Sequence, residues 1–111
     1  MTTEERKNTE AVEQAPETRE SRLRARLVKH QRKMMRLTSQ MQQAISGIKE
    51  FEDIMAEDGQ FFTETEKAQY RKKKELLQQQ YATAHNEFEE LKGRVRVVEE
   101  MLAAEGGGSD D

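Results

Sequence analysis

Apolar residues recur along residues 23–55 at alternating steps of four and three, which is the spacing of a heptad repeat. One series consists of Leu27, Met34, Met41, Ile48 and Met55, and the interleaved series of Leu23, His30, Leu37, Ala44 and Phe51. They occupy the a and d positions of nearly five heptads. The pattern predicts a long helix with one apolar stripe, interrupted by a single polar residue, His30.

The same pattern returns later in the chain. One series consists of Tyr70, Leu77, Ala84, Leu91 and Val98, and the other of Tyr81, Phe88, Val95 and Leu102. Lys74 also falls at a core position, where its alkyl stem is expected to lie on the seam while the ammonium reaches water. A second long helix is therefore predicted.

The segment between the two stretches carries signals that end one helix and begin another. Gly59 follows Asp58, and we expect it to adopt a left-handed C-cap conformation. Thr63 and Glu66 have the spacing of a capping box at the start of the next helix. Because the connection is short, the two helices must run antiparallel.

The sequence thus predicts an all-α fold, an antiparallel two-helix coiled-coil hairpin with disordered acidic tails. The hairpin occupies residues 20–104, with helices at about 20–57 and 63–104 and a length of about 55 Å. Residues whose numbers sum to about 118–122 should face each other, as Met41 and Leu77 would. The polar segment 1–19 is expected to be disordered, and 105–111 to be a flexible Gly/Asp tail whose glycines end the last helix.

Composition supports an elongated shape over a globular one. Hydrophobic residues make up 33% of the 111 residues, which is too few for a thick core. Charged residues make up 37%, which is more than such a core allows. The absence of Cys excludes disulfides and thiolate chemistry. No apolar run approaches the roughly 18 residues that span a bilayer, and the first residues do not form an apolar signal segment. We expect a cytoplasmic protein, with the nucleus as an open alternative.

No constellation of residues predicts catalysis, a cofactor or a metal. His30 and His85 could approach each other across the hairpin, with Glu87 and Glu89 as the nearest carboxylates in sequence. We interpret His30 as a polar break that helps fix the register, and His85 as a flanking residue. A two-helix rod also offers no cleft for paired carboxylates. The sequence therefore favours a protein that is not an enzyme.

A run of bases without an acid follows the predicted start of the first helix. Its members at the flanks of the heptad are Arg22, Arg26, Lys29, Arg32, Lys33 and Arg36, here called the basic stripe. The stripe could bind phosphates or an acidic partner. Alternatively, it could pair with glutamates of the second arm, such as Glu90 and Glu99. The lack of interleaved aromatic residues favours internal pairing over nucleic-acid binding.

Hydrophobic residues outside the seam point to a partner. They are Val28, Met35, Ile45, Ile54, Leu76, Val97 and Met101, here called the flank residues. Two helices cannot bury both the seam and these side chains, and apolar exposure costs ~25 cal/mol per Å². We therefore expect a partner helix, from a second copy or from another protein. Phe61 and Phe62 in the turn could close the end of the rod or project as a hook.

Two short stretches resemble tubulin-folding cofactor A. Residues 26–29 (Arg-Leu-Val-Lys) resemble a segment of that family's first helix, and residues 56–59 (Ala-Glu-Asp-Gly) resemble the acidic turn after it. The gap between the stretches is longer here by about a heptad, no proline lies midway in the second arm, and a third helix is missing. The resemblance implies a small helical rod that holds β-tubulin during its folding.

The function expected first is that of a helical-hairpin adaptor, or a small subunit of a larger complex. A tubulin-binding chaperone is the alternative hypothesis. A nucleic-acid-associated protein that uses the basic stripe is a third hypothesis. Phosphate binding weakens steeply with salt whereas an apolar helix interface does not, so salt dependence distinguishes the third from the others.

Overall fold

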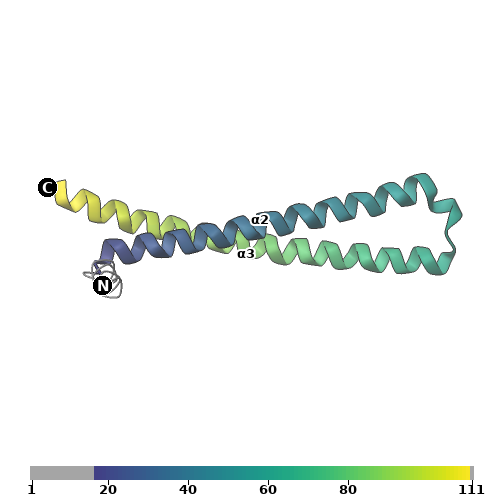
Figure 1. The fold of residues 1–111 in the computed structure, drawn as a ribbon, viewed down its shortest axis with the longest axis horizontal. Coiled ribbons are helices and arrows are strands. Elements are labelled where there is room, and N and C mark those ends of the chain that lie inside the picture. Colours follow the sequence, from purple (N-terminus) through teal and green to yellow (C-terminus); the bar gives the residue numbers. More distant parts are fainter. Residues whose placement is uncertain (1–16, 111) are drawn as a thin grey trace, which may run out of the picture.

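The computed structural model describes residues 17–110, which form two long helices joined by a short turn (Figure 1). Helix α2 spans Arg19–Asp58, the 3-10 helix η1 spans Gly59–Phe61, and α3 spans Glu64–Asp110. The two long helices pack against each other, and the described part of the chain contains no strand. The predicted all-α hairpin is confirmed. Most of the predicted N-terminal tail, residues 1–16, lies outside the described residues.

Helix α2 begins at a capping box that the sequence prediction missed. The Ser21 amide donates to the Thr18 hydroxyl at 3.0 Å, and the Thr18 amide donates to the Ser21 hydroxyl at 3.1 Å. A serine in place of the usual Glu or Gln at the third helical position disguised the motif. The helix consequently starts at Arg19, inside the segment that was predicted to be disordered.

The turn has a different backbone conformation from the predicted one. Gly59 lies in the right-handed helical region, at φ −54° and ψ −29°, so the predicted left-handed cap is wrong. The chain tightens into η1 instead, and the Phe62 amide donates to the Gly59 carbonyl at 3.1 Å. Extended backbone at Phe62 then redirects the chain. The second capping box is confirmed, with Thr63 and Glu66 exchanging hydrogen bonds of 2.9 and 3.1 Å.

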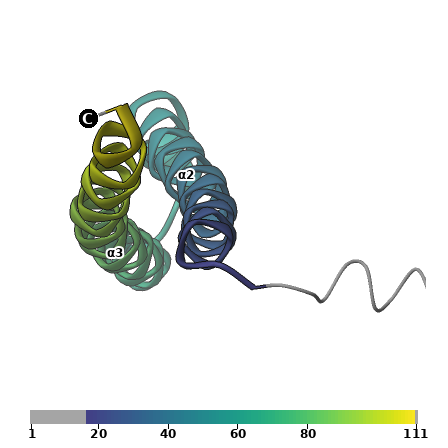
Figure 2. The same cartoon turned by 90° about the vertical axis from the view of Figure 1, so that its left-hand side faces the viewer.

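The core is one row of residues along the seam. The buried side chains all occupy d positions and are Leu37, Ala44, Ala84, Leu91 and Val98. The a positions are only half-buried. Two of the buried residues are alanines, whose small side chains permit close approach near the middle of the rod. Figure 1 shows the helices overlapping in the middle and separating toward both ends, and Figure 2 shows from the end that they cross at an angle.

The register agrees with the prediction near the turn and is displaced slightly from it farther along the rod. The rings of Phe51 and Tyr70, whose numbers sum to 121, lie 5.8 Å apart. Farther along, Leu77 contacts the backbone position of Gly47, and the numbers sum to 124. The heptad pattern defines which residues face the seam, but it does not fix the offset between the arms. The close approach of Leu77 to Gly47 helps to set that offset.

The end of α3 also differs from the prediction. The helix was expected to stop at about 104, yet it continues through the glycines to Asp110. Glycine is less favourable than alanine in a helix by about 1 kcal/mol, but its backbone can adopt the helical conformation. The longest dimension is 68 Å, beyond the predicted length of about 55 Å.

Candidate partner-binding surfaces

Six of the seven flank residues are exposed. Their exposed fractions are 44% for Val28, 73% for Met35, 41% for Ile45, 55% for Leu76, 54% for Val97 and 46% for Met101. Ile54 is half-buried instead, because it lies beside the seam close to the turn. The exposed residues do not form one patch. They fall mainly on two surfaces, a groove at the open end of the hairpin and the outer face of α2.

The open-end groove lies between the first turns of α2 and the last turns of α3. Its apolar lining is Leu23, Val97, Val98 and Met101, and its polar lining is Arg26, His30 and Arg94. The groove has a volume of about 500 Å³. It exists because the helices diverge toward this end (Figure 1), leaving side chains of both arms without a covering layer.

The outer face of α2 is a second, shallower hollow of about 520 Å³. It is lined by Ala25, Val28, Lys29, Arg32, Met35 and Arg36, all from one side of the same helix. Val28 and Met35 are seven residues apart and therefore lie two turns apart on that side. The surrounding bases make this an apolar strip with positive edges.

The basic stripe does not pair with α3 as predicted. Within residues 17–105, the ion pair that joins the two arms is Arg19–Glu105, at 3.2 Å. Arg22 lies 3.9 Å from Glu17, next to the start of its own helix. Arg26, Lys29, Arg32, Lys33 and Arg36 have no carboxylate within 4.0 Å among the described residues.

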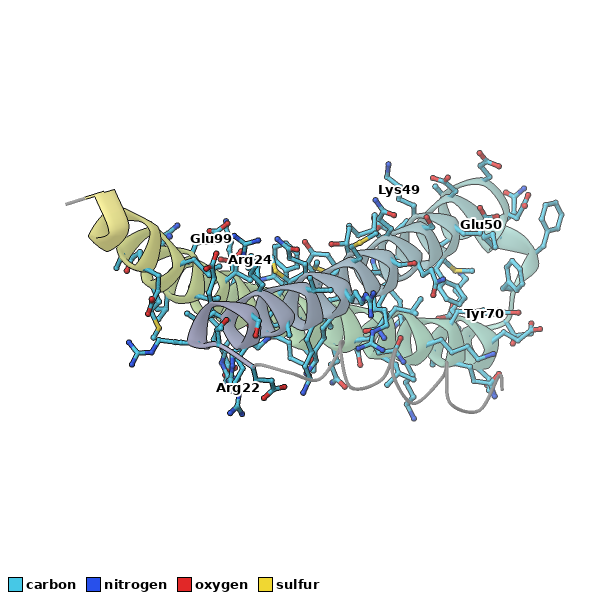
Figure 3. All side chains as sticks on the ribbon, turned by 60° about the vertical axis from the view of Figure 1, so that its left-hand side comes forward. Arg22, Arg24, Lys49, Glu50, Tyr70 and Glu99 are labelled. Atoms are coloured by element: carbon cyan, nitrogen blue, oxygen red, sulfur yellow. The ribbon has the colours of Figure 1, made fainter. Side chains whose placement is uncertain are left out.

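Two features explain why the predicted cross-arm pairs are missing. Lys29, Arg32 and Arg36 lie at heptad positions that face away from α3. On α3, Glu90 binds Arg94 of its own helix at 2.7 Å. Figure 3 shows Arg22 and Arg24 projecting from opposite sides of the first turns of α2. The structure therefore leaves most of the stripe available to an outside partner.

The two histidines have separate surroundings. His30 is half-buried at the edge of the open-end groove. Burial lowers its pKa below the ordinary value, and the nearby charges of Arg26 and Arg94 lower the pKa further, followed by those of Lys29 and Lys33. His85 instead stacks on Tyr81 and lies 3.8 Å from Glu89.

The two phenylalanines of the turn have different roles. Phe62 is half-buried, and its ring meets Tyr70 edge-on with centroids 5.4 Å apart. Phe61 is 76% exposed. One ring therefore closes the end of the rod while the other projects from it. Phe61 was missing from the predicted partner-binding residues, and the Phe-Phe dipeptide alone contains no signal for which ring turns inward.

No protein-family model, curated protein or solved structure matches the chain. Among the described residues, no three His, Cys, Asp or Glu side chains gather closely enough to hold a metal ion. None of the described helices combines the length and the apolar character needed to cross a membrane. The exposed apolar and basic surfaces are thus the strongest candidates for a functional site.

Proposed function

We propose that the chain is a non-enzymatic interaction module, an adaptor or small subunit, that binds a helix of another protein in its open-end groove. The observation that supports this most is the exposure of Val97 and Met101, at 54% and 46%, beside the apolar floor formed by Leu23 and Val98. An amphipathic helix can bury such a groove by placing anchors at i, i+3, i+4 and i+7.

The rim of the groove favours a particular kind of helix. Arg26 of α2 and Arg94 of α3 both line the groove, and so does His30. Arg26 has no carboxylate within 4.0 Å among the described residues, whereas Arg94 already pairs with Glu90 of its own helix at 2.7 Å. A partner helix with acidic residues beside its apolar anchors would match this rim. Such charge complementarity contributes mainly to specificity and association rate.

The test is affinity purification followed by direct binding measurements on the purified partner. The double substitution Val97→Glu and Met101→Glu should eliminate binding while leaving the circular dichroism spectrum unchanged, because both side chains lie outside the seam. Leu76→Glu is the matched control, since Leu76 is equally exposed but lies elsewhere on α3. Binding that survives the double substitution, or is lost equally in the control, would contradict the groove as the site.

Nucleic-acid binding is the second candidate, and the unpaired members of the basic stripe favour it. Phosphate contacts release counterions, so binding through Lys29, Arg32 and Lys33 would fall steeply as salt rises. The exposed Val28 and Met35 gain nothing from a phosphate backbone, which is why a protein partner is preferred. Titration of labelled RNA and DNA at several salt concentrations distinguishes the two.

A tubulin-binding role is the narrower form of the main proposal. It is supported by the resemblance at residues 26–29 and 56–59, and both stretches contain exposed side chains on α2. Co-sedimentation with purified tubulin tests it directly.

A further inference from the structure

Helix α2 has a long basic segment followed by a shorter acidic segment at its C-terminal end. Between Glu20 and Glu50 there is no acid, and the segment includes the whole basic stripe. From Glu50 to Asp58 there are five acids and no base. Figure 3 shows Arg22 and Arg24 near one end of α2 and Glu50 toward the other. The helix therefore has an electrostatic polarity along its length that is much larger than that of its backbone dipole.

Both segments present charges on the same outer face. With 3.6 residues per turn, the bases Lys29, Arg32 and Arg36 share a face with the acids Glu50, Asp53 and Glu57. All six are exposed. The three bases follow one another at steps of three and four, and so do the three acids. The exposed Val28 and Met35 lie on the same face, so this surface combines opposite charges with apolar contacts.

None of the six has an ion-pair partner within 4.0 Å among the described residues. The hairpin thus leaves two complementary sets of charge unsatisfied on one helix. They cannot meet each other within the helix, because even the nearest members, Arg36 and Glu50, are separated by roughly 21 Å of helix. Pairing them with opposite charge would take a second surface.

The arrangement is self-complementary when the helix is reversed. Residues whose numbers sum to 85 or 86 then face each other, and the facing pairs are Lys29 with Glu57, Arg32 with Asp53, Arg36 with Glu50, Ser39 with Ser46, and Gln42 with Gln43. Uncharged side chains, two serines and two glutamines, occupy the middle, where two crossing helices come closest.

We propose that two copies of the chain associate through the outer faces of α2, antiparallel, around a twofold axis near Gln43. The contact covers residues 29–57, about 42 Å of helix. Lys29, Arg32 and Arg36 each face an acid of the other copy, and twofold symmetry repeats every such contact, as in any isologous interface. Ala56 comes to lie near Val28 of the other copy. This contact is centred near Gln43, away from the open-end groove. The dimer is therefore independent of the partner helix proposed to bind that groove.

A second copy fits this face better than an unrelated acidic helix does. An acidic helix would match Lys29, Arg32 and Arg36 but would oppose Glu50, Asp53 and Glu57 with like charge. A parallel second copy would likewise place base against base. A partner that satisfies the whole face must carry its own charges in the reverse order, and α2 of an antiparallel copy does.

Sedimentation equilibrium of the full chain at about 0.05 M and about 0.5 M salt tests the proposal. We expect a dimer that weakens at the higher salt. Arg32→Glu with Arg36→Glu should raise the dimer dissociation constant at least about tenfold, and so should Glu50→Arg with Asp53→Arg. Mixing these two variants should restore a dimer, because each then supplies the charge that the other lacks. A single chain with all four substitutions should also dimerise.

The matched control is Arg71→Glu with Lys72→Glu, which makes the same change of net charge on α3 and should leave the dimer intact. Since the chain has no Cys, single cysteines report the geometry. Gln43→Cys should form a disulfide-linked dimer on oxidation, whereas Lys29→Cys should not. A monomeric wild type, failure of the mixed variants to associate, or efficient cross-linking at Lys29→Cys would overturn the proposal.

Discussion

Leu77 packs directly against the backbone of Gly47. A Cβ atom built on Gly47 would lie 2.8 Å from Cδ1 of Leu77, closer than real Cβ contacts come. The glycine thus makes room for a leucine from the other arm, next to the buried alanines Ala44 and Ala84. This contact helps to set the register between the two helices.

The two mid-helix glycines should respond differently to alanine. A Cβ on Gly93 meets no atom within 4 Å, so Gly93→Ala should raise the free energy of unfolding by about 0.5–1 kcal/mol through helix propensity alone. At Gly47 the same gain is opposed by displacement of Leu77, and Gly47→Ala should stabilise less or destabilise. Urea unfolding of both variants measures this. Equal stabilisation by the two substitutions would show that the close approach has no energetic consequence.

The capping box at the start of α3 should contribute measurably to stability. Thr63→Ala removes the hydroxyl that accepts a hydrogen bond from the Glu66 amide. We expect the free energy of unfolding to fall by about 1 kcal/mol. Thr65→Ala is the control, because Thr65 is exposed within the first turn of the helix and has no capping role. Thermal unfolding compares them. A Thr63 variant as stable as the Thr65 variant would argue against the cap.

Much of the fold could be predicted from the heptad periodicity and from helix-capping signals. The heptad series placed Leu37, Leu91 and Val98 in the seam, and these are buried. The pair Thr63 and Glu66 located the start of the second helix, because capping is a local interaction between residues close in sequence. The exposure of flank residues such as Val97 followed from their heptad positions outside the seam. Local rules and helical geometry were sufficient for these features.

Features that depend on competition between alternatives could not be predicted. Gly59 is compatible with both left- and right-handed backbone, and the tertiary context of the turn selects the latter. The register depends on the fit of Leu77 against Gly47, which a heptad pattern does not contain. Glu90 could pair either with the basic stripe of the opposite arm or with Arg94, one turn away on its own helix. In the structure it pairs with Arg94.

The two turn phenylalanines should separate stability from recognition. Phe62→Ala removes the ring that packs edge-on against Tyr70, and half-burial suggests a loss of about 1–2 kcal/mol. Phe61→Ala should change stability by less than about 0.5 kcal/mol, because the ring is 76% exposed. Chemical denaturation provides the measurement. A large destabilisation from Phe61→Ala would mean that this ring packs in solution.

His30 should make stability depend on pH near neutrality. Its folded-state pKa is lowered, first by burial and then by Arg26, Lys29 and Lys33 of α2 and Arg94 of α3. The unfolded chain, with a pKa near 6.5, therefore binds the proton more readily. The stability that neutral His30 contributes is fully present above the unfolded pKa, and it is lost as pH falls through 6.5 toward the folded value.

His30→Leu should remove that pH dependence and raise the melting temperature, because an apolar side chain at this d position has no proton to accept and no polar group to bury. Melting curves at pH 7.5 and about pH 5.5 give the comparison, since the ordinary pKa of histidine lies between these two values. The gap between variant and wild type should widen on acidification. His85→Gln controls for the loss of a histidine at an exposed site beside Glu89. If wild type and His30→Leu lose equal stability, then solvent reaches His30 freely, and the charges of Arg26 and Arg94 at the open-end groove are screened by water. The rim proposed to select an acidic partner helix would then be weaker than the static arrangement of these residues indicates.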